Sequence, residues 1–443
     1  MGTVGSPEVI PGGTHCRFCA EPLDVSVVDL GMSPPCQNVV RQEELELGER
    51  FYPLHVRACH RCWLLQIPEL VEPTELFTEY AYFSSYSTSW VEHARRYVEM
   101  MVGRADLDEH SFVVELASND GYLLQHFVAS GIPVLGIEPA LNVAEAATER
   151  GVPTLTEFFG RELAQHIASS RRPADLIVGN NVLAQVPDVN DFVAGVKSLL
   201  APNGTATFEV PHVARLIERT EYDTIYHEHF SYFTLGTLRE IFAASGLVLF
   251  DVEELPTHGG SIRAFFGHVE EDVAVSSAVE DLLAAETAEG LFTPEPYARF
   301  AESVRESKRA LLDALIRERA RGRHIVGYGA PGKGNTLLNY CGIRTDLLDY
   351  TVDRNPYKQG CFTPGTRIPI HPPERLAETR PDLILILPWN LAAEISKQLA
   401  YTAEWGAKLA VPIPLVTLFE PGRLPGGRTV PRPRHDLAAE GTS

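Results

Sequence analysis

Hydrophobic and polar positions along this chain of 443 residues follow two successive blocks of alternating strand and helix patterns. In the first block, short apolar runs typical of buried strands are separated by amphipathic stretches with helical spacing. A helix at 90–102 precedes this block. Strands are then predicted at residues 112–116, 134–137, 175–178, 206–210 and 247–253, and helices at 121–129, 143–150, 160–167, 189–200 and 235–244. This alternation favours an α/β fold with a parallel, doubly wound sheet.

A second, smaller block begins after a long charged helix that is predicted from about residue 295 to residue 321, where Gly322 provides a stop. Its strands are predicted at 324–328, 348–352, 383–387 and 408–412, and its helices at 334–340 and 391–400. A segment with five of the seven cysteines precedes both blocks. We therefore expect three domains, followed by a disordered tail: residues 14–78, 79–290, 291–420 and, for the tail, 421–443.

The composition narrows the class of partner. The net charge is −21, and no long basic run reverses it. Such a chain repels nucleic acid and anionic membranes. It has no run of about 18 apolar residues that would span a membrane, and residues 1–14 lack the apolar core of a secretion signal. We expect a cytoplasmic protein without nucleic-acid or membrane partners. The oligomeric state is left open, and a monomer is compatible with the sequence.

Four of the cysteines form two C-x-x-C pairs, Cys16 with Cys19 and Cys59 with Cys62. Two residues between thiolates let both bind one tetrahedral ion, and four thiolates close a structural zinc site that leaves no position open for chemistry. Buried thiol pairs and a redox dithiol are the alternatives, but the doubled motif in a reducing compartment favours zinc. The loop between the pairs is longer than in the commonest zinc ribbons. The other cysteines are expected to pack as ordinary thiols: Cys36, Cys341 and Cys361.

A nucleoside site is predicted where the first strands of the central block end. The turn A-S-N-D-G at 117–121 closes with Gly121, which allows a close backbone approach, and the next strand ends in Glu138, placed to accept hydrogen bonds from a ribose. The turn lacks a pyrophosphate fingerprint, which favours S-adenosylmethionine over NAD. A generic α/β turn with a surface glutamate is the alternative. The predicted cofactor-binding residues are Glu115, Ala117, Asn119, Gly121, Glu138, Pro139, Asn180 and Asn181.

The run Y-H-E-H-F-S-Y-F at 226–233 is the candidate catalytic cluster, because it follows the strand at 206–210 and active sites lie at the carboxyl ends of parallel strands. Histidine can take a proton near neutral pH, a carboxylate can orient the imidazole, and a tyrosine hydroxyl can stabilise an oxyanion. An H-x-H zinc site would lack a third ligand nearby, and simple packing is the remaining alternative. The sequence does not decide whether His227 or His229 faces a substrate.

Two further stretches have the composition of a substrate site. A polar and aromatic stretch before the helix at 90–102 is suited to a sugar, and the turn H-G-G-S-I-R offers an arginine that could meet a phosphate. A plain loop is equally compatible with each. The residues concerned are Tyr80, Tyr82, Ser84, Ser85 and Tyr86 in the first stretch, and His258, Ser261 and Arg263 in the second.

The second block opens with a glycine-rich turn at residues 327–335. Backbone N–H groups at the start of the following helix, together with Lys333, would make an anion site. The glycines also fit G-x-G-x-x-G, and Asp353 closes the next strand, so a dinucleotide fingerprint is an alternative that is weak by itself. A structural turn is the third interpretation.

The order of these motifs resembles that of the deoxysugar C-methyltransferases of bacterial antibiotic pathways. The zinc pairs, E-L-A-S-N-D-G, N-N-V-L-A, E-V-P, Y-H-E-H-F-S-Y-F, H-G-G-S and G-Y-G-A-P-x-K-G-N-T carry the resemblance over about residues 14–420. It implies an N-terminal zinc-binding domain, a central Rossmann-like class I methyltransferase domain and a smaller C-terminal α/β domain. The implied cofactors are S-adenosylmethionine and structural Zn²⁺. The implied substrate is a dTDP-linked 4-keto deoxysugar, usually methylated at C3.

The resemblance also implies roles for single residues. His229 matches the candidate base, Tyr226 and Glu228 lie beside it, and Tyr82 matches a tyrosine that reaches the sugar. The family usually has N-V-L-A-H after the strand at 175–178, whereas this chain has Gln185, which can donate a hydrogen bond but cannot shuttle a proton.

The resulting hypothesis is methyl transfer to carbon. His229, oriented by Glu228, removes the proton next to the C4 ketone, and Tyr226 and Gln185 stabilise the enolate while its carbon attacks the methyl group. Three alternatives stay open at this point: an NAD(P)-dependent oxidoreductase that uses the glycine-rich turn, a non-catalytic sugar-nucleotide-binding relative, and a methyltransferase that acts on oxygen or nitrogen.

Overall fold

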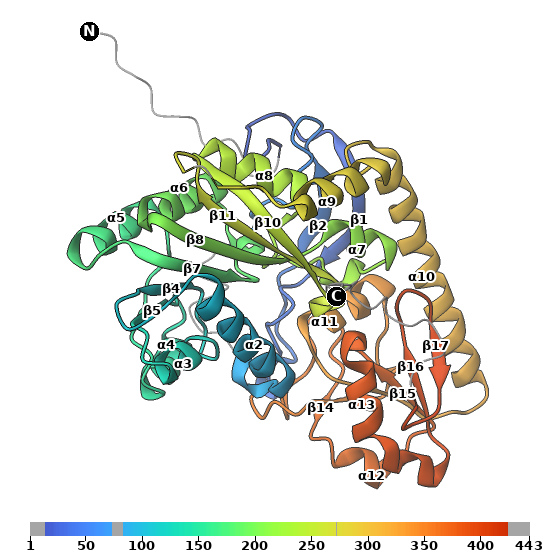
Figure 1. Cartoon of the computed structure of the whole chain (residues 1–443). Coiled ribbons are helices and arrows are strands. Elements are labelled where there is room, and N and C mark those ends of the chain that lie inside the picture. The colour runs from blue at the N-terminus through green and yellow to red at the C-terminus, as the bar shows by residue number, and fades with distance from the viewer. Residues whose placement is uncertain (1–13, 73–82, 272, 424–443) are drawn as a thin grey trace, which may run out of the picture.

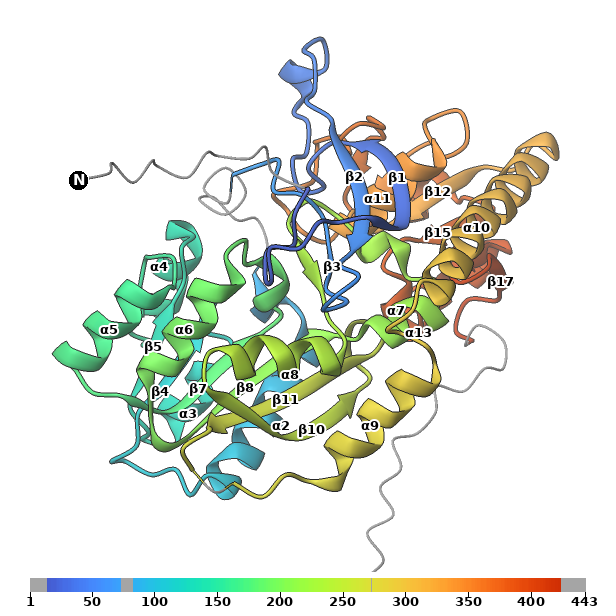
Figure 2. The same cartoon turned by 90° about the horizontal axis from the view of Figure 1, so that it is seen from above.

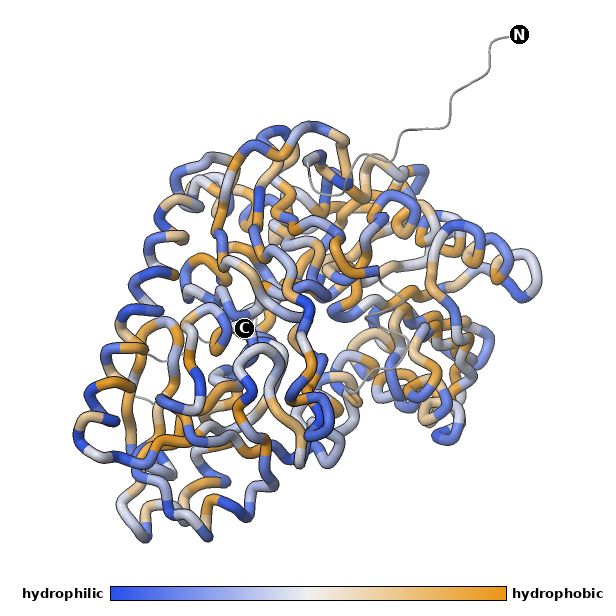
Figure 3. Tube along the Cα trace, turned by 180° about the vertical axis from the view of Figure 1, so that it is seen from behind, coloured by the Kyte–Doolittle hydropathy of each residue, from blue (hydrophilic) through white to orange (hydrophobic). Residues whose placement is uncertain are grey.

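The computed structural model describes residues 14–72, 83–271 and 273–423, which form three sheets (Figure 1). Tyr80 and Tyr82 lie outside the described residues, as does the predicted tail from position 424 onward. No helix in these described ranges combines the length and apolarity that a membrane span requires. Hydrophobic segments concentrate in the strands and hydrophilic ones in the surrounding loops and outer helical turns (Figure 3).

The N-terminal sheet is antiparallel, and its fourth strand comes from the candidate catalytic run. One face packs against the long helix α10 (Glu295–Ala320) and against α11 (Gly332–Cys341) in a shared apolar core. The zinc-binding domain is therefore joined to both other parts of the chain. Its strands, in spatial order, are β1 (Val25–Ser33), β2 (Tyr52–Ala58), β3 (Leu65–Gln66) and β9 (Ser231–Tyr232).

The central sheet has seven strands in the order β10-β11-β8-β7-β4-β5-β6. Strands β4 to β8 pair in parallel, as predicted, but β11 lies antiparallel between β8 and β10, so the sheet is mixed. The sequence analysis missed β11 because nearly all of its positions are buried and show no alternation. The strands are β4 (Val113–Leu116), β5 (Val134–Ile137), β6 (Thr154–Leu155), β7 (Ala174–Asn180), β8 (Leu200–Pro211), β10 (Leu247–Leu255) and β11 (Ser261–His268).

Helices cover both faces of the central sheet. One apolar core joins it to α5, α6, α8 and α9, and a second joins it to α2, α3 and α4 (Figure 2). The predicted helices all exist, within a few residues of their expected bounds. They are α2 (Thr88–Arg104), α3 (Leu124–Ala129), α4 (Leu141–Glu149), α5 (Arg161–Ser170), α6 (Val189–Leu199) and α8 (Leu235–Ala244). Two further helices, α7 (Val213–Glu218) and α9 (Ser277–Ala288), were not predicted.

The C-terminal sheet repeats the doubly wound plan in the order β14-β13-β12-β15-β16-β17, with only β17 antiparallel. The strand order reverses between β12 and β15, and ligands of such sheets bind at that point. Helices α10 and α11 cover one face, and α12 and α13 cover the other. The remaining elements are β12 (Ile325–Tyr328), β13 (Thr351–Val352), β14 (Ile370–His371), β15 (Leu383–Ile386), β16 (Lys408–Val411), β17 (Thr417–Phe419), α12 (Arg375–Thr379) and α13 (Ala392–Gln398).

Short 3₁₀ helices connect several of these elements, and most of them lie near strand ends. They are η1 (Gln42–Glu44), η2 (Ser84–Tyr86), η3 (Leu183–Gln185), η4 (Tyr222–Thr224), η5 (Thr257–Gly259), η6 (Trp389–Leu391) and η7 (Ala400–Trp405).

Candidate functional site

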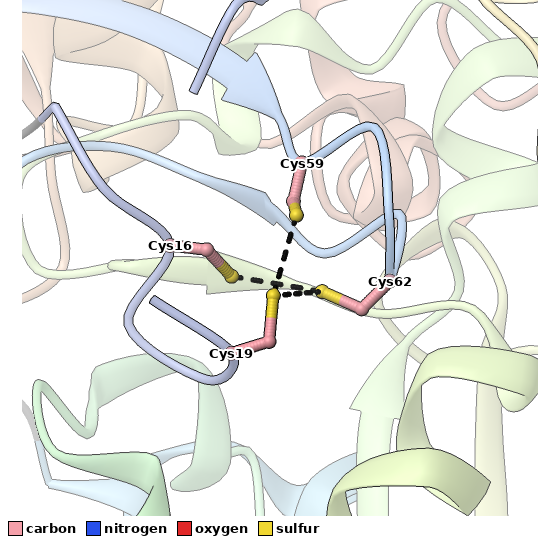
Figure 4. A group of neighbouring side chains, drawn as sticks. All are labelled: Cys16, Cys19, Cys59 and Cys62. Atoms are coloured by element: carbon pink, nitrogen blue, oxygen red, sulfur yellow. Dashed lines mark hydrogen bonds between the residues drawn. The ribbon is translucent and has the colours of Figure 1, made fainter. Parts of the chain in front are cut away.

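The four paired cysteines converge on one point (Figure 4). Their Sγ atoms lie 3.6 Å apart for Cys16 and Cys62, 3.5 Å for Cys19 and Cys59, and 3.7 Å for Cys19 and Cys62. A tetrahedral zinc–thiolate shell with bonds of about 2.3 Å has sulfur–sulfur edges of about 3.8 Å. The four thiols therefore fit a closed zinc site.

Both C-x-x-C pairs have the same backbone conformation. The N–H group of Ala20 donates to the carbonyl of Cys16, and that of Trp63 donates to the carbonyl of Cys59, each over 2.9 Å. Ala20 and Trp63 have φ angles of 60° and 56°, so the chain turns sharply after each second cysteine. The buried Gln66 amide donates to Cys16 Sγ over 3.2 Å and supports this thiolate.

A cavity of about 1380 Å³ lies where the carboxyl ends of the central and C-terminal strands face each other. Its lining follows β4, β5, β7 and β8 on one side, and β12, β13 and β15 on the other. Each sheet thus contributes the edge at which doubly wound folds bind ligands.

Six of the eight predicted cofactor residues line this cavity. Their turns hold non-glycine residues in the left-handed region, with φ of 55° at Ala117, 48° at Asn119 and 56° at Asn181, a strain that concentrates at ligand sites. Glu115 and Gly121 are not among the lining residues, and Gly121 packs against the next loop. The lining residues are Ala117, Asn119, Glu138, Pro139, Asn180 and Asn181.

Glu138 ties the end of β5 to the first turn of the sheet. Its carboxylate accepts hydrogen bonds from the backbone N–H groups of Asn119 (3.0 Å) and Ala140 (2.9 Å). Burial raises the pKa of Glu138 to about 6, although these two bonds oppose the shift. Burial, together with the charges of Glu138 and Asp120, also holds the pKa of Glu115 well above its ordinary value.

His229 and Tyr226 are the members of the candidate catalytic run that face the cavity. A turn in which the His229 N–H donates to the Tyr226 carbonyl brings their rings to 4.0 Å. Nδ1 of His229 lies 3.0 Å from the carbonyl of Thr224, so this nitrogen donates and Nε2 keeps its lone pair. Burial lowers the pKa of His229 to about 3, and the nearby His258 and Lys333 add to the shift. The imidazole is neutral at pH 7, as a general base must be.

Two expectations for this run are corrected. Glu228 was expected to orient His229, but the Thr224 carbonyl holds that position, and Glu228 accepts a hydrogen bond from Cys36 Sγ over 3.6 Å. His227 packs against the Tyr52 ring at 5.8 Å, and neither it nor Glu228 lines the cavity. The chain makes a single helical turn here. Tyr226 and His229 are three positions apart and share one face of it, whereas the two residues between them point elsewhere.

Among the other predicted substrate residues, Gln185, Ser84, His258 and Lys333 line the cavity. Gln185 ends η3 directly after β7, on the same wall as Tyr226 and His229. Burial lowers the pKa of His258 to about 4, and the charge of Lys333 adds to the shift, so this imidazole is also neutral at pH 7.

Arg263, Ser261 and Ser85 do not line the cavity, which corrects three predictions. The Arg263 guanidinium is buried and donates to Glu209 (2.8 Å) and Glu253 (2.9 Å). Two carboxylates already compensate its charge, so it is not available to a phosphate. Ser85 donates to the Asp120 carboxylate, and Ser261 donates to the carbonyl of Thr257.

The glycine-rich turn lines the cavity and is also contacted by the zinc-binding domain. A Cβ atom on Gly332, the third glycine of G-x-G-x-x-G, would lie 2.7 Å from Cys36 Sγ and 3.1 Å from the Gln37 amide. The Asn335 amide donates to the Cys36 carbonyl over 2.6 Å and fixes this contact. Gly332 therefore allows the zinc-binding domain to approach the start of α11 closely. In a dinucleotide-binding turn the third glycine likewise serves close packing, and the second one faces the pyrophosphate.

Sequence reasoning missed several residues of the cavity wall. The loop after β13 contributes Asp353, Arg354, Asn355 and Lys358, and the zinc-binding domain contributes Gln37. Only Asp353, which closes a predicted strand, had a local signal. The aromatic side of the wall contains Phe83, Trp90, His93 and Tyr122, together with Tyr86 from the predicted polar and aromatic stretch.

Three family models match the chain in succession. They are described as "Putative zinc binding domain" for residues 16–77, "Methyltransferase domain" for residues 90–252 and "C-methyltransferase C-terminal domain" for residues 256–414. C-methyltransferase NovU of Streptomyces niveus is 39% identical over 403 residues, which cover 90% of this chain and 95% of NovU. These matches and the cysteine cluster confirm the predicted fold class and the two predicted cofactors, S-adenosylmethionine and structural zinc.

Solved structures resemble part of the chain. The PH0226 protein from Pyrococcus horikoshii OT3 is 14% identical, with a TM-score of 0.35, and the match covers 45% of this chain and 96% of that one. Magnesium protoporphyrin IX methyltransferase (ChlM) from Synechocystis PCC 6803, solved with bound SAM, is 13% identical, with a TM-score of 0.31, and the match covers 40% and 78%.

Proposed function

The chain belongs to the C-methyltransferase family, and from this premise we propose that it methylates C3 of a dTDP-linked 4-keto deoxysugar in antibiotic biosynthesis. The single observation that carries this proposal is the neutral His229 on the cavity wall between the cofactor turn and a cationic C-terminal loop. Formation of a carbon nucleophile requires a base that is unprotonated at neutral pH. A phosphate-linked substrate requires, in addition, cationic side chains at the opposite end of the cavity.

The proposed chemistry follows from the side chains around the cavity. S-adenosylmethionine supplies an electrophilic methyl group when bound. His229 Nε2 takes the proton from the carbon next to the C4 ketone, and Tyr226 and Gln185 hydrogen-bond the enolate oxygen. The bound cofactor would give its methyl group to the substrate carbon and leave as S-adenosylhomocysteine, and His229 would release the proton to solvent.

Binding of the substrate should itself strengthen the base. Lys333 lowers the pKa of both His229 and His258 through its positive charge. A diphosphate beside Lys333 neutralises that charge and raises the pKa of His229 towards the value at which an imidazole accepts protons efficiently. The base would then be most effective when the nucleotide end of the substrate is in place.

The test is incubation of the purified protein with S-adenosylmethionine and a panel of dTDP-4-keto deoxysugars, followed by mass spectrometry. We expect a product heavier by one methylene, with deuterium lost from C3 of a labelled substrate. A non-keto dTDP-sugar should give no product. Methylation of the non-keto sugar would favour transfer to oxygen. Binding of both ligands without any transfer would favour the non-catalytic interpretation that Gln185 suggests.

Substitution of the base is the sharpest prediction for the mechanism. His229→Asn should lower kcat by a factor of about 10² to 10⁴, the usual contribution of general base catalysis. Affinity for S-adenosylmethionine, measured by calorimetry, should change little because His229 is not part of the cofactor turns. His227→Asn is the matched control, since His227 lies outside the cavity. Equal losses in the two variants would contradict the assignment.

The predicted cytoplasmic location and the absence of nucleic-acid and membrane partners stay predictions.

A further inference from the structure

A segment of the zinc-binding domain reaches the C-terminal unit. Residues 34–51, here called the strap, run between β1 and β2, and account for the unusual distance between the two cysteine pairs. Val40 exchanges two backbone hydrogen bonds with Phe362, of 2.9 and 2.8 Å. The Glu49 carboxylate accepts from the backbone N–H of Gly365 (2.6 Å) and from the Arg367 guanidinium (3.0 Å). The strap is thus fixed to the C-terminal unit at several points.

Lys358 is a buried cation beside the strap. Its side chain lines the cavity although the residue is only 8% exposed. The ammonium group donates to Gln37 Oε1 over 3.2 Å and to the Ala330 carbonyl over 2.8 Å, both neutral acceptors. Within the part of the chain that the structure describes, no ion pair of 4.0 Å or less involves this lysine. The Asp353 carboxylate, which also lines the cavity, accepts instead from the backbone N–H of Ala330 over 2.7 Å.

This arrangement is energetically incomplete without a ligand. A buried ammonium group loses its hydration, and neutral hydrogen-bond acceptors compensate that loss only in part. A counter-charge that enters the cavity would complete the compensation.

The rest of this wall is suited to an anion. Lys333 also has a neutral partner, Asn390 Oδ1 at 3.3 Å, and its ammonium group lies over the Trp389 ring at 5.0 Å. Arg354 is exposed and lines the same wall, and α11 begins there at Gly332. Three cationic side chains therefore gather on one wall of a protein whose net charge is −21.

We propose that Lys358 and Gln37 form a diphosphate subsite shared between the C-terminal unit and the zinc-binding domain. Lys358 binds a phosphate oxygen of the nucleotide sugar, and Gln37 is a positioning residue that directs its ammonium group into the cavity. This inference rests on the proposed function, because it takes the substrate to be a nucleotide-linked sugar. It gives the zinc-binding domain a part in substrate binding in addition to its role in folding.

Calorimetric titration of the full chain with thymidine diphosphate, thymidine and S-adenosylmethionine tests this proposal. Lys358→Met keeps the length of the side chain and removes its charge, so the affinity for thymidine diphosphate should fall about 10- to 100-fold, as expected for a charge-assisted hydrogen bond. The affinity for S-adenosylmethionine should stay within about threefold, below the effect of one ordinary hydrogen bond. Lys308→Met is the matched control, because Lys308 also donates to a backbone carbonyl, that of Tyr340, but lies outside the cavity.

A second variant tests the subsite while Lys358 itself is kept. Gln37→Glu preserves shape but supplies a competing carboxylate, so it should weaken thymidine diphosphate binding more than Gln37→Ala does. Wild-type affinity for thymidine diphosphate in Lys358→Met or in Gln37→Glu would overturn the subsite and leave the proposed function intact. Failure of the wild-type protein to bind thymidine diphosphate would overturn both.

Discussion

The two doubly wound units of this protein make opposite use of the turn that follows their first strand. In the central unit, the turn after β4 has one glycine, and it opens onto the cavity through Ala117 and Asn119. In the C-terminal unit, the turn after β12 is rich in glycine, yet Cys36 of the strap packs against Gly332. The residue that meets each turn therefore decides its role, and the number of glycines does not.

Zinc removal should produce the largest difference between the ligand affinities of the two units. The C-terminal wall of the cavity includes a contact with Gln37 of the strap, whereas Asn119 in the turn after β4 is held by Glu138 of the same sheet. Structural zinc contributes on the order of 10 kcal/mol to folding of its domain, so chelation should lower affinity for thymidine diphosphate by at least about a hundredfold. Affinity for S-adenosylmethionine should fall by less than about tenfold.

Calorimetry on chelated and zinc-reconstituted protein measures this difference. Recovery of nucleotide binding on reconstitution controls for irreversible damage. Parallel losses of the two ligands would show that both sites depend equally on the zinc-binding domain.

Substitution of one glycine in each turn by alanine compares the packing of the two turns. Gly332→Ala places a Cβ atom 2.7 Å from Cys36 Sγ, and overpacking of this kind costs about 1–3 kcal/mol. Cys36→Ala should restore much of the loss in the double variant, because it removes the colliding sulfur. Gly121→Ala should also be destabilising, since φ there is +75°, but no strap substitution should rescue it. Urea unfolding of the four variants measures these free energies, and a purely additive double variant would argue against the contact.

The smallest expected effect is a shift in the pH dependence of kcat/KM when the charge of Lys333, in the turn after β12, is removed. The pKa values of about 3 for His229 and about 4 for His258 leave both imidazoles neutral as the pH falls from 7 to 5, so kcat/KM should not show the acid limb of an ordinary histidine. Lys333→Met removes a charge that lowers both pKa values and should move the acid limb upward. An unchanged pH profile in Lys333→Met would show that the charge of Lys333 does not act on the two histidines.

The sign of the stability effect follows from the same lowered pKa values. In the unfolded chain both histidines have ordinary pKa values near 6.5, so below this pH the unfolded state binds protons that the folded state refuses. Their contribution to stability is therefore present above pH 6.5 and is lost as the pH falls towards 3 to 4.

Local sequence patterns predicted the strands, helices and zinc ligands because each depends on residues close in the chain. His229, the base that the resemblance implies, lines the cavity together with Tyr226, although the sequence by itself did not decide between His227 and His229. The sequence did not predict which side chains would pair with one another. Nothing near Arg263 in the sequence indicates that Glu209 neutralises its charge, and nothing near Glu228 indicates that Cys36 binds it.

Residues that belong to the cavity only through contacts between domains were missed for the same reason. Gln37 and Lys358 are separated by most of the chain and meet because the strap crosses to the C-terminal unit. A single sequence records hydrophobic periodicity within an element, but it does not record which distant loop will cover a given turn.

The fourth strand of the N-terminal sheet sets an order of assembly during synthesis. β9 pairs with β3, yet the ribosome makes it only after five of the seven strands of the central sheet have been translated. Until then the outer edge of β3 has unpaired backbone groups, the kind of edge that invites association with other chains. The N-terminal sheet therefore cannot be completed until the chain has been made as far as Tyr232, and a fragment that ends before Ser231 should aggregate when expressed alone.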